Sequence, residues 1–161
     1  MKHHQVTHVL TVMIGAQPVY PDHFTYHVIH VRDIPDENLL VHLPAAIQFI
    51  EEAGEAGGTV FVHCAAGKRT IRFFLMFFAL CFIPLHAAGQ RTIDFFLCFF
   101  AIGVSRSATV VCAWLMSTRN MTHREAIDFL ISRRSIVKPN PGFVKQLQLF
   151  EQMLTRTNAT E

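Results

Sequence analysis

A cysteine at the end of a short apolar run is the residue of this sequence best suited to nucleophilic chemistry. Cys64 follows the run VFVH, and a stretch of small residues, Ala65, Ala66 and Gly67, comes directly after it. The thiolate is the reactive form, but a free cysteine with a pKa of about 8.5 is mostly protonated near neutral pH. A place between a strand and a helix N-terminus favours the anion, because backbone N–H groups and the helix dipole converge there.

The small residues lead into a segment whose composition differs from the rest of the chain. Residues 68–103 hold nine of the fifteen phenylalanines in thirty-six positions. The segment also repeats, since AAGKRTIRFFLMFFA at 65–79 matches AAGQRTIDFFLCFFA at 87–101 in twelve of fifteen positions. Two copies are too few for a repeat architecture, so we interpret this as a duplication. Its apolar runs, of thirteen and eight residues, are short for a membrane span, which needs about twenty, yet they are the only candidate for membrane attachment.

The remaining sequence predicts an alternation of strands and helices. Short β-branched runs predict strands, and apolar residues at helical spacing predict helices. The helix at 122–134 has a capping box, with Thr122 at its start and Glu125 three residues on. The expected strands are 6–12, 26–31 and 59–63, and the expected helices are 39–58, 105–120, 122–134 and 142–154.

Joining Gly67 to Val104 gives VFVHCAAGVSRSATVVCAWLM. This string resembles His-Cys-x-x-Gly-x-x-Arg-Ser, the signature of the cysteine-dependent protein phosphatases. Its particular residues are similar to those of the dual-specificity phosphatases. The segments VIHVRDIPDENLLVHLPAAIQFIEEA and RRSIVKPNPGFVKQLQLFE resemble the family's general-acid loop and C-terminal segment. The resemblance covers nearly everything except 68–103. It implies a cysteine-phosphatase α/β fold, a central mixed sheet flanked by helices, in one domain (1–161) that is short at its N-terminus.

The resemblance also implies a role for each matching residue. Cys64 is the nucleophile, Arg106 clamps phosphate oxygens with its planar fork, and Asp33 protonates the leaving oxygen and then assists water. Ser107 eases departure of the thiolate, His63 tunes it, and Asn140 braces the loop. The expected phosphate-binding residues are Ala65, Ala66, Gly67, Val104, Ser105 and Arg106.

These roles imply hydrolysis of phosphotyrosine, and of phosphoserine or phosphothreonine, through a phosphocysteine. No metal or cofactor is implied, and the expected partner is a phosphoprotein. A net charge of only +2 gives no strong attraction to nucleic acid. The four cysteines show no paired or zinc-ligand spacing, so we expect reduced thiols in the cytoplasm or nucleus. The oligomeric state stays open.

Simpler interpretations exist for individual residues. Cys64 could be a small core residue, and Asp33 could be a turn residue before Pro35. Arg106 could be a surface arginine at a helix start, and Asn140 between two prolines could only form a turn.

The inserted segment separates the two halves of the motif. Forty-one residues lie between Cys64 and Arg106, where the motif has five, and neither Arg69 nor Arg72 falls at the right spacing. An inactive phosphatase-like interaction module is therefore the alternative function. A retained intron would explain the insert, because both of its ends can be encoded with splice signals. Gly67-Lys68 can be encoded GGT AAG, which contains GTAAG, the usual start of an intron. Ile102-Gly103 can be encoded ATA GGT, which contains AG, the usual end of one.

Overall fold

Three parallel strands form the sheet that carries the predicted nucleophile. The computed structural model describes residues 6–64, 82–83, 95–96 and 104–158. Its sheet has the order β2-β1-β3, with β1 at His8–Val12, β2 at Thr25–Ile29 and β3 at Val60–His63. Val12 pairs with Ile29, and Thr11 pairs with His63, so the carboxyl ends of all three strands share one edge.

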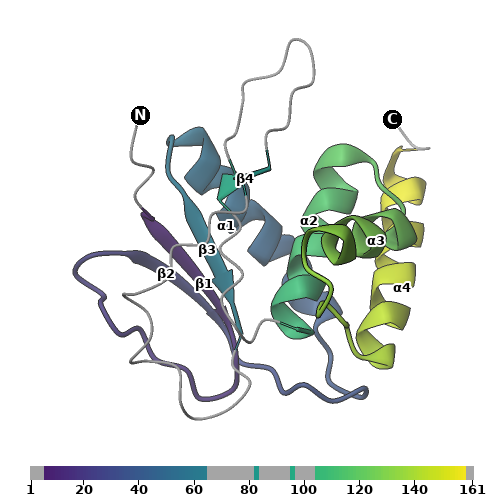
Figure 1. Cartoon of the computed structure of the whole chain (residues 1–161), viewed down its shortest axis with the longest axis horizontal. Coiled ribbons are helices and arrows are strands. Elements are labelled where there is room, and N and C mark those ends of the chain that lie inside the picture. The colour runs from purple at the N-terminus through teal and green to yellow at the C-terminus, as the bar shows by residue number, and fades with distance from the viewer. Residues whose placement is uncertain (1–5, 65–81, 84–94, 97–103, 159–161) are drawn as a thin grey trace.

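Helices flank this sheet. Figure 1 shows the sheet at one side of the molecule and α2 (Arg106–Arg119), α3 (His123–Arg133) and α4 (Pro141–Asn158) at the other. Between them, α1 (Leu43–Glu55) contacts both β3 and α2. The α/β fold expected from the sequence is confirmed, and the described strands of its sheet all run parallel.

The inserted segment contributes only one described feature. The strands β4 (Phe82–Ile83) and β5 (Phe95–Phe96) pair antiparallel in a separate two-stranded sheet. All other residues of 65–103 lie outside the described residues, including Ala65, Ala66 and Gly67. Among the helices that are described, none is long and apolar enough to cross a bilayer.

The predicted helix at 39–58 is shorter in the structure. Its first residues form the 3₁₀ turn η1 (Leu40–His42), and α1 follows with Pro44 in its first turn, where proline needs no N–H partner. The helix ends before Gly57, whose φ of 72° lies in the left-handed region that glycine adopts without strain. The capping box predicted at Thr122 and Glu125 is confirmed at the start of α3.

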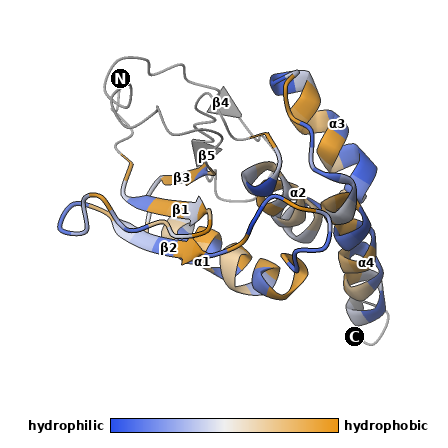
Figure 2. Ribbon diagram, turned by 90° about the horizontal axis from the view of Figure 1, so that it is seen from below, coloured by the Kyte–Doolittle hydropathy of each residue, from blue (hydrophilic) through white to orange (hydrophobic). Residues whose placement is uncertain are grey.

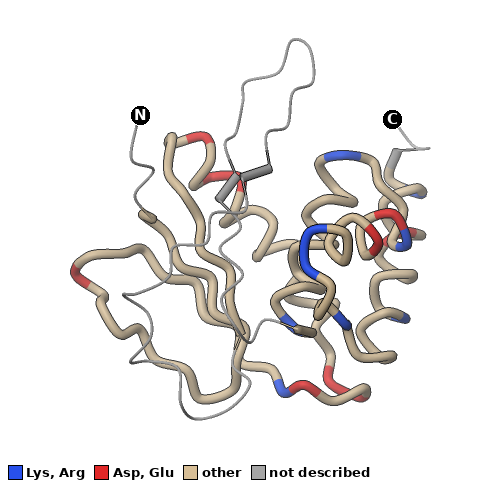
Figure 3. Tube along the Cα trace, viewed as in Figure 1, with Lys and Arg blue, Asp and Glu red and all other residues tan. Residues whose placement is uncertain are grey.

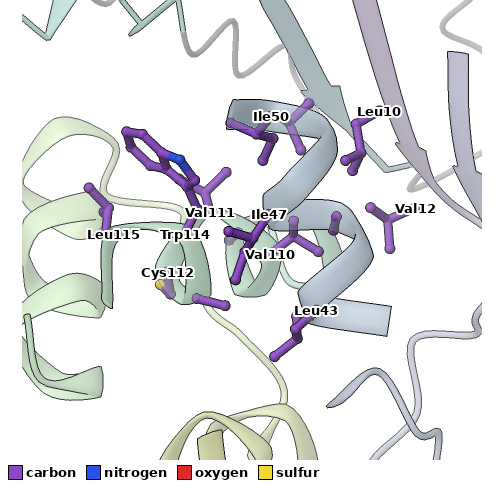
Figure 4. Close-up of a cluster of buried hydrophobic side chains, with 14 of the residues drawn as sticks. Leu10, Val12, Leu43, Ile47, Ile50, Val110, Val111, Cys112, Trp114 and Leu115 are labelled. Carbon is purple, nitrogen blue, oxygen red and sulfur yellow. The ribbon is translucent and has the colours of Figure 1, made fainter. Parts of the chain in front are cut away.

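The second helix, α2, is the centre of the core. It contacts α1, α3, α4, β1 and β3, and every residue from Arg106 to Met116 is buried. Figure 4 shows side chains of β1, α1 and α2 meeting in one cluster. The labelled residues are Leu10, Val12, Leu43, Ile47, Ile50, Val110, Val111, Cys112, Trp114 and Leu115. The start of α2 is thereby fixed against the sheet by packing.

The main sheet and the helices differ in where their charged and hydrophobic residues lie. The three strands of the main sheet carry no lysine, arginine, aspartate or glutamate, and the charged residues gather on the loops and helices (Figure 3). Hydrophobic and hydrophilic residues alternate along α3 and α4 (Figure 2), as expected for helices with one face on the core. In α4 the buried side includes Phe143, Leu147 and Phe150.

Candidate active site

The predicted nucleophile lies where β3 ends at the carboxyl edge of the sheet. Cys64 is 6% exposed, and its Sγ accepts a hydrogen bond from Ser107 Oγ at 3.2 Å. Ser107 belongs to the first turn of α2, so the helix N-terminus meets the end of the strand. The structure thus brings together two residues that are 43 positions apart in this chain but seven positions apart in the phosphatase motif. The carboxyl edge of a parallel sheet is also where ligands bind in α/β proteins.

The other described cysteine lies in a different environment. Cys112 is fully buried in the middle of α2, and its burial raises the pKa of the thiol to about 12. Cys112 therefore stays protonated and packs as a small apolar residue. Cys64, at the strand end, is the described cysteine with a hydroxyl donor against its sulfur.

Arg106 begins α2 and points back toward the loop after β2. Its Nη1 donates to the carbonyl of Val31 at 3.1 Å, and its Nε lies 3.7 Å from Asp33 Oδ2. The residue is 7% exposed, so the interpretation as a surface arginine is wrong. Burying a guanidinium is costly unless it is paired, and the carboxylate and carbonyl supply that pairing.

Asp33 lies in the loop that follows β2 and is exposed. Its Oδ1 accepts hydrogen bonds from Ser105 Oγ at 2.7 Å and from Asn140 Nδ2 at 2.8 Å. Because Ser105, Arg106 and Ser107 are consecutive, one helical turn contacts both the predicted nucleophile and the predicted acid. Asp33 is therefore more than a turn residue before a proline.

Asn140 links the loop to the start of α4. Its side-chain oxygen accepts from the backbone N–H of Phe143 at 3.0 Å, as an N-cap does, while its amide nitrogen binds Asp33. Its own backbone N–H donates to Ser105 Oγ at 3.0 Å. One side chain thus caps a helix and holds the carboxylate, which a turn former would not do.

His63 lies beside Cys64 in sequence, but its ring turns toward β1. Its Nε2 is 2.8 Å from Thr11 Oγ1, and the ring stacks on Phe61 with centroids 4.9 Å apart. Burial lowers the pKa of His63 to about 4. The ring is neutral near pH 7, so any influence on the thiolate comes through dipoles and hydrogen bonds and not through a positive charge.

The structure describes the second predicted half of the phosphate loop but not the three residues after Cys64. Ala65, Ala66 and Gly67 lie outside the described residues. Val104 is half-buried, and its carbonyl accepts from the backbone N–H of Lys138 at 2.8 Å. The second half of the loop is thereby tied to the segment that leads into α4.

Sequence reasoning missed Gln146 and Gly142. Gln146 binds the backbone of the loop after β2, and Gly142 lies against Pro35. A signal existed for the glutamine, because it stands at helical spacing from Phe143 and Phe150, on the buried side of α4. A polar side chain at such a position needs a partner.

The site is suited to phosphoryl transfer through a cysteine. It combines a thiol at a strand end, a hydroxyl that donates to its sulfur, a helix N-terminus, a buried guanidinium and a carboxylate. The family comparison agrees with this class. A model described as "Dual specificity phosphatase, catalytic domain" matches residues 1–75 and 97–153, and the chain belongs to this family. The positions between the two matched ranges, 76–96, all fall within the predicted insert.

Individual relatives carry related names. Dual specificity protein phosphatase 1 of Arabidopsis thaliana is 33% identical over 154 residues, which are 96% of this chain and 60% of that protein. Dual specificity protein phosphatase 19 of Mus musculus is 30% identical over 151 residues, which are 94% of this chain and 52% of that protein. The chain therefore spans between about half and two thirds of the length of these two curated relatives.

Solved structures share the fold. A human tyrosine phosphatase-like serine/threonine/tyrosine-interacting protein has a TM-score of 0.69 at 26% identity, over 93% of this chain and 79% of that chain. Human DUSP28 has a TM-score of 0.68 at 26% identity, over 94% of this chain and 81% of that chain.

Proposed function

We propose that this chain is a protein phosphatase that hydrolyses phosphotyrosine, and phosphoserine or phosphothreonine, through a phosphocysteine at Cys64. The observation that carries the proposal is the hydrogen bond from Ser107 Oγ to Cys64 Sγ. This contact joins Cys64, from the first half of the interrupted motif, to Ser107, from the second half. It favours the enzyme over the inactive interaction module, whose premise is that the halves stay apart.

In the first step the thiolate of Cys64 attacks phosphorus. An S–P bond forms, the P–O bond to the substrate breaks, and protonated Asp33 gives its proton to the leaving oxygen. The N-terminus of α2 favours the thiolate and the phosphate through its dipole and backbone N–H groups. Arg106 opposes the charge that develops on the phosphate oxygens, and Val104 and Ser105, with Ala65, Ala66 and Gly67, would supply the surrounding amides.

In the second step water hydrolyses the phosphocysteine. The carboxylate of Asp33 takes a proton from the attacking water, the S–P bond breaks, and inorganic phosphate leaves. The hydroxyl of Ser107 donates a hydrogen bond to the departing sulfur, which its 3.2 Å contact with Sγ already prepares. A reduced compartment, the cytoplasm or nucleus, fits this cycle because an oxidised Cys64 cannot attack.

We also propose that 1–161 forms one phosphatase domain and that 68–103 is an insertion that entered through a retained intron. The family match, which stops at 75 and resumes at 97, supports an insertion in this place. Sequencing transcripts across the codons of Gly67 and Val104 tests the genetic part. A population of messages that all carry the insert would overturn the intron, whereas a shorter message that joins Gly67 to Val104 would support it.

The activity itself is tested with the full chain and a small aryl phosphate. We expect hydrolysis of 4-nitrophenyl phosphate by the unmodified chain and none above background by the Cys64→Ser variant. Cys112→Ser is the matched control, because that thiol is buried within α2, and it should retain activity. Equal rates for the unmodified chain and Cys64→Ser would overturn the proposed function.

A further inference from the structure

The loop that carries Asp33 is attached to the start of α4 at three successive points. Asp33 binds Asn140, Pro35 lies against Gly142, and the backbone of residues 37–40 binds Gln146. The contacts follow the same order along both segments, so the loop runs alongside the first two turns of the helix. We propose that Gln146 is a positioning residue that holds this loop, and with it the general acid, in place. The proposal rests on the proposed function.

Gln146 makes three hydrogen bonds to one stretch of backbone. Its Oε1 accepts from the N–H groups of Leu39 and Leu40, each at 2.8 Å, and its Nε2 donates to the carbonyl of Glu37 at 2.8 Å. The side-chain amide has four hydrogen-bonding sites, and three are used here. These bonds hold the backbone of residues 37–40 in a single position relative to α4.

The bonds also satisfy a helix start that has no local cap. The 3₁₀ turn η1 begins at Leu40, and Leu39, its N-cap residue, makes no side-chain cap hydrogen bond. The first N–H groups of a helix lack partners within the helix. Gln146, which is 107 positions away from Leu39, supplies the acceptor. The turn between the acid loop and α1 therefore depends on a side chain of α4.

Gly142 makes the close approach possible. A Cβ at this position would overlap with backbone atoms of Pro35. Backbone cannot yield as the end of a flexible side chain can, so any larger residue must push the loop away from α4. The loop is thus held by polar bonds at its two ends and by close packing at its centre.

Gln146 differs from Asn140 in what it touches. Asn140 donates directly to the carboxylate of Asp33, so its substitution changes the acid group itself as well as its place. The hydrogen bonds described for the Gln146 side chain all go to backbone, at residues four to seven positions after Asp33. A substitution of Gln146 therefore displaces the acid and leaves its chemical surroundings intact. Small displacements of a catalytic group can cost up to about 100-fold in rate.

The test compares Gln146→Ala with Gln148→Ala in the full chain. Gln148 is exposed on the same helix and serves as the matched control. Two substrates are used, phenyl phosphate, whose leaving group needs a proton, and 4-nitrophenyl phosphate, whose leaving group departs more easily as an anion. We expect Gln146→Ala to lower kcat/KM about tenfold on phenyl phosphate and less than about twofold on 4-nitrophenyl phosphate. Gln148→Ala should change neither.

A cycle with Asp33→Asn completes the experiment. If Gln146 acts through the acid, Gln146→Ala should lower the rate no further once Asp33 is replaced. An equal loss on both substrates, or an additive loss in the Asp33→Asn background, would overturn the proposal. Gln146→Glu keeps the acceptor for Leu39 and Leu40 but loses the donor to Glu37, so it should give an intermediate loss if Gln146→Ala proves too unstable to assay.

Failure of the proposed function is separable from failure of this inference. If the unmodified chain and Cys64→Ser hydrolyse neither substrate, the phosphatase proposal fails. Amide hydrogen exchange at Leu39 and Leu40 then decides the role of Gln146 in holding the loop. Faster exchange in Gln146→Ala than in Gln148→Ala supports the attachment, and equal exchange overturns it.

Discussion

Packing fixes one side of the candidate site, and hydrogen bonds fix the other. The side that carries the proposed nucleophile, the nucleophile side, is buried between the end of β3 and the start of α2 and consists of Cys64, Arg106 and Ser107. The side that carries the proposed acid, the acid side, is the loop of Asp33, whose side chain is 35% exposed and which is attached to α4 by polar contacts. Close-packed cores allow little adjustment, whereas exposed loops open more easily. Substitutions on the two sides should therefore differ in how far they affect the fold.

After the complete loss expected for Cys64→Ser, the next largest effect is expected for Arg106→Lys on the nucleophile side. Lysine keeps the charge but cannot present two parallel donors to phosphate, and its ammonium would replace the buried guanidinium beside Val31. We expect kcat/KM for 4-nitrophenyl phosphate to fall about 1,000-fold, with a lower thermal midpoint as well. A loss below about tenfold would show that the arginine fork is not used in the transition state.

Asp33→Asn on the acid side should reduce activity and weaken the fold less than Arg106→Lys does, although it removes the carboxylate charge that lies 3.7 Å from Arg106 Nε. Asparagine keeps an oxygen that can accept from Ser105 and Asn140, but it cannot give a proton to the leaving group. The expected loss in kcat/KM for phenyl phosphate is about 100-fold, and the loss for 4-nitrophenyl phosphate is smaller. A fall in thermal midpoint as large as that of Arg106→Lys would contradict the contrast between the two sides.

His63 on the nucleophile side should make the stability of the fold depend on pH. Burial lowers its folded-state pKa to about 4 from the ordinary histidine value of 6.5. Below pH 6.5 the His63 ring is protonated in the unfolded chain but stays neutral in the folded chain, which favours unfolding. The stability that the neutral ring allows is therefore fully present above pH 6.5 and is lost as the pH falls toward 4. Between pH 7.5 and pH 5 the loss amounts to about 2 kcal/mol, measurable by urea unfolding.

The control for this prediction is His63→Asn, which lacks a titrating ring. Other histidines also contribute to the pH dependence of stability, including His8 and His27, whose pKa values are lowered by burial. The difference between the unmodified chain and His63→Asn isolates the contribution of His63. Equal pH dependence in both proteins would mean that the ring is solvated in the folded state.

The nucleophile side could be predicted from the sequence, but the attachment of the acid loop could not. Cys64, Arg106 and Ser107 form a motif once 68–103 is removed, and in the structure Ser107 Oγ donates a hydrogen bond to Cys64 Sγ. The contacts of Gln146 and Gly142 depend on how α4 packs against a loop about 107 positions earlier. Hydrogen bonds to backbone leave no periodic pattern in the partner segment, because any residue has the N–H and carbonyl groups that they use.

Ser107→Ala gives the smallest expected effect and the sharpest distinction within the nucleophile side. Ser107 is fully buried, but the substitution removes only its hydroxyl, and the acceptor that loses this hydrogen bond is the sulfur of Cys64. Sulfur is a weak acceptor, so the fold should keep its stability. In the first step Cys64 attacks the substrate and no sulfur leaves, so the hydrogen bond from Ser107 is not needed there. In the second step the sulfur of Cys64 is the leaving group, and the hydrogen bond stabilises it. We expect a burst of nitrophenol followed by turnover about tenfold slower, with phosphocysteine detectable by intact mass after rapid quenching. Ser117→Ala, exposed on the same helix, should show no burst. Slow turnover without a burst would place Ser107 in the first step and would mean that its contact with Cys64 activates the attacking thiolate.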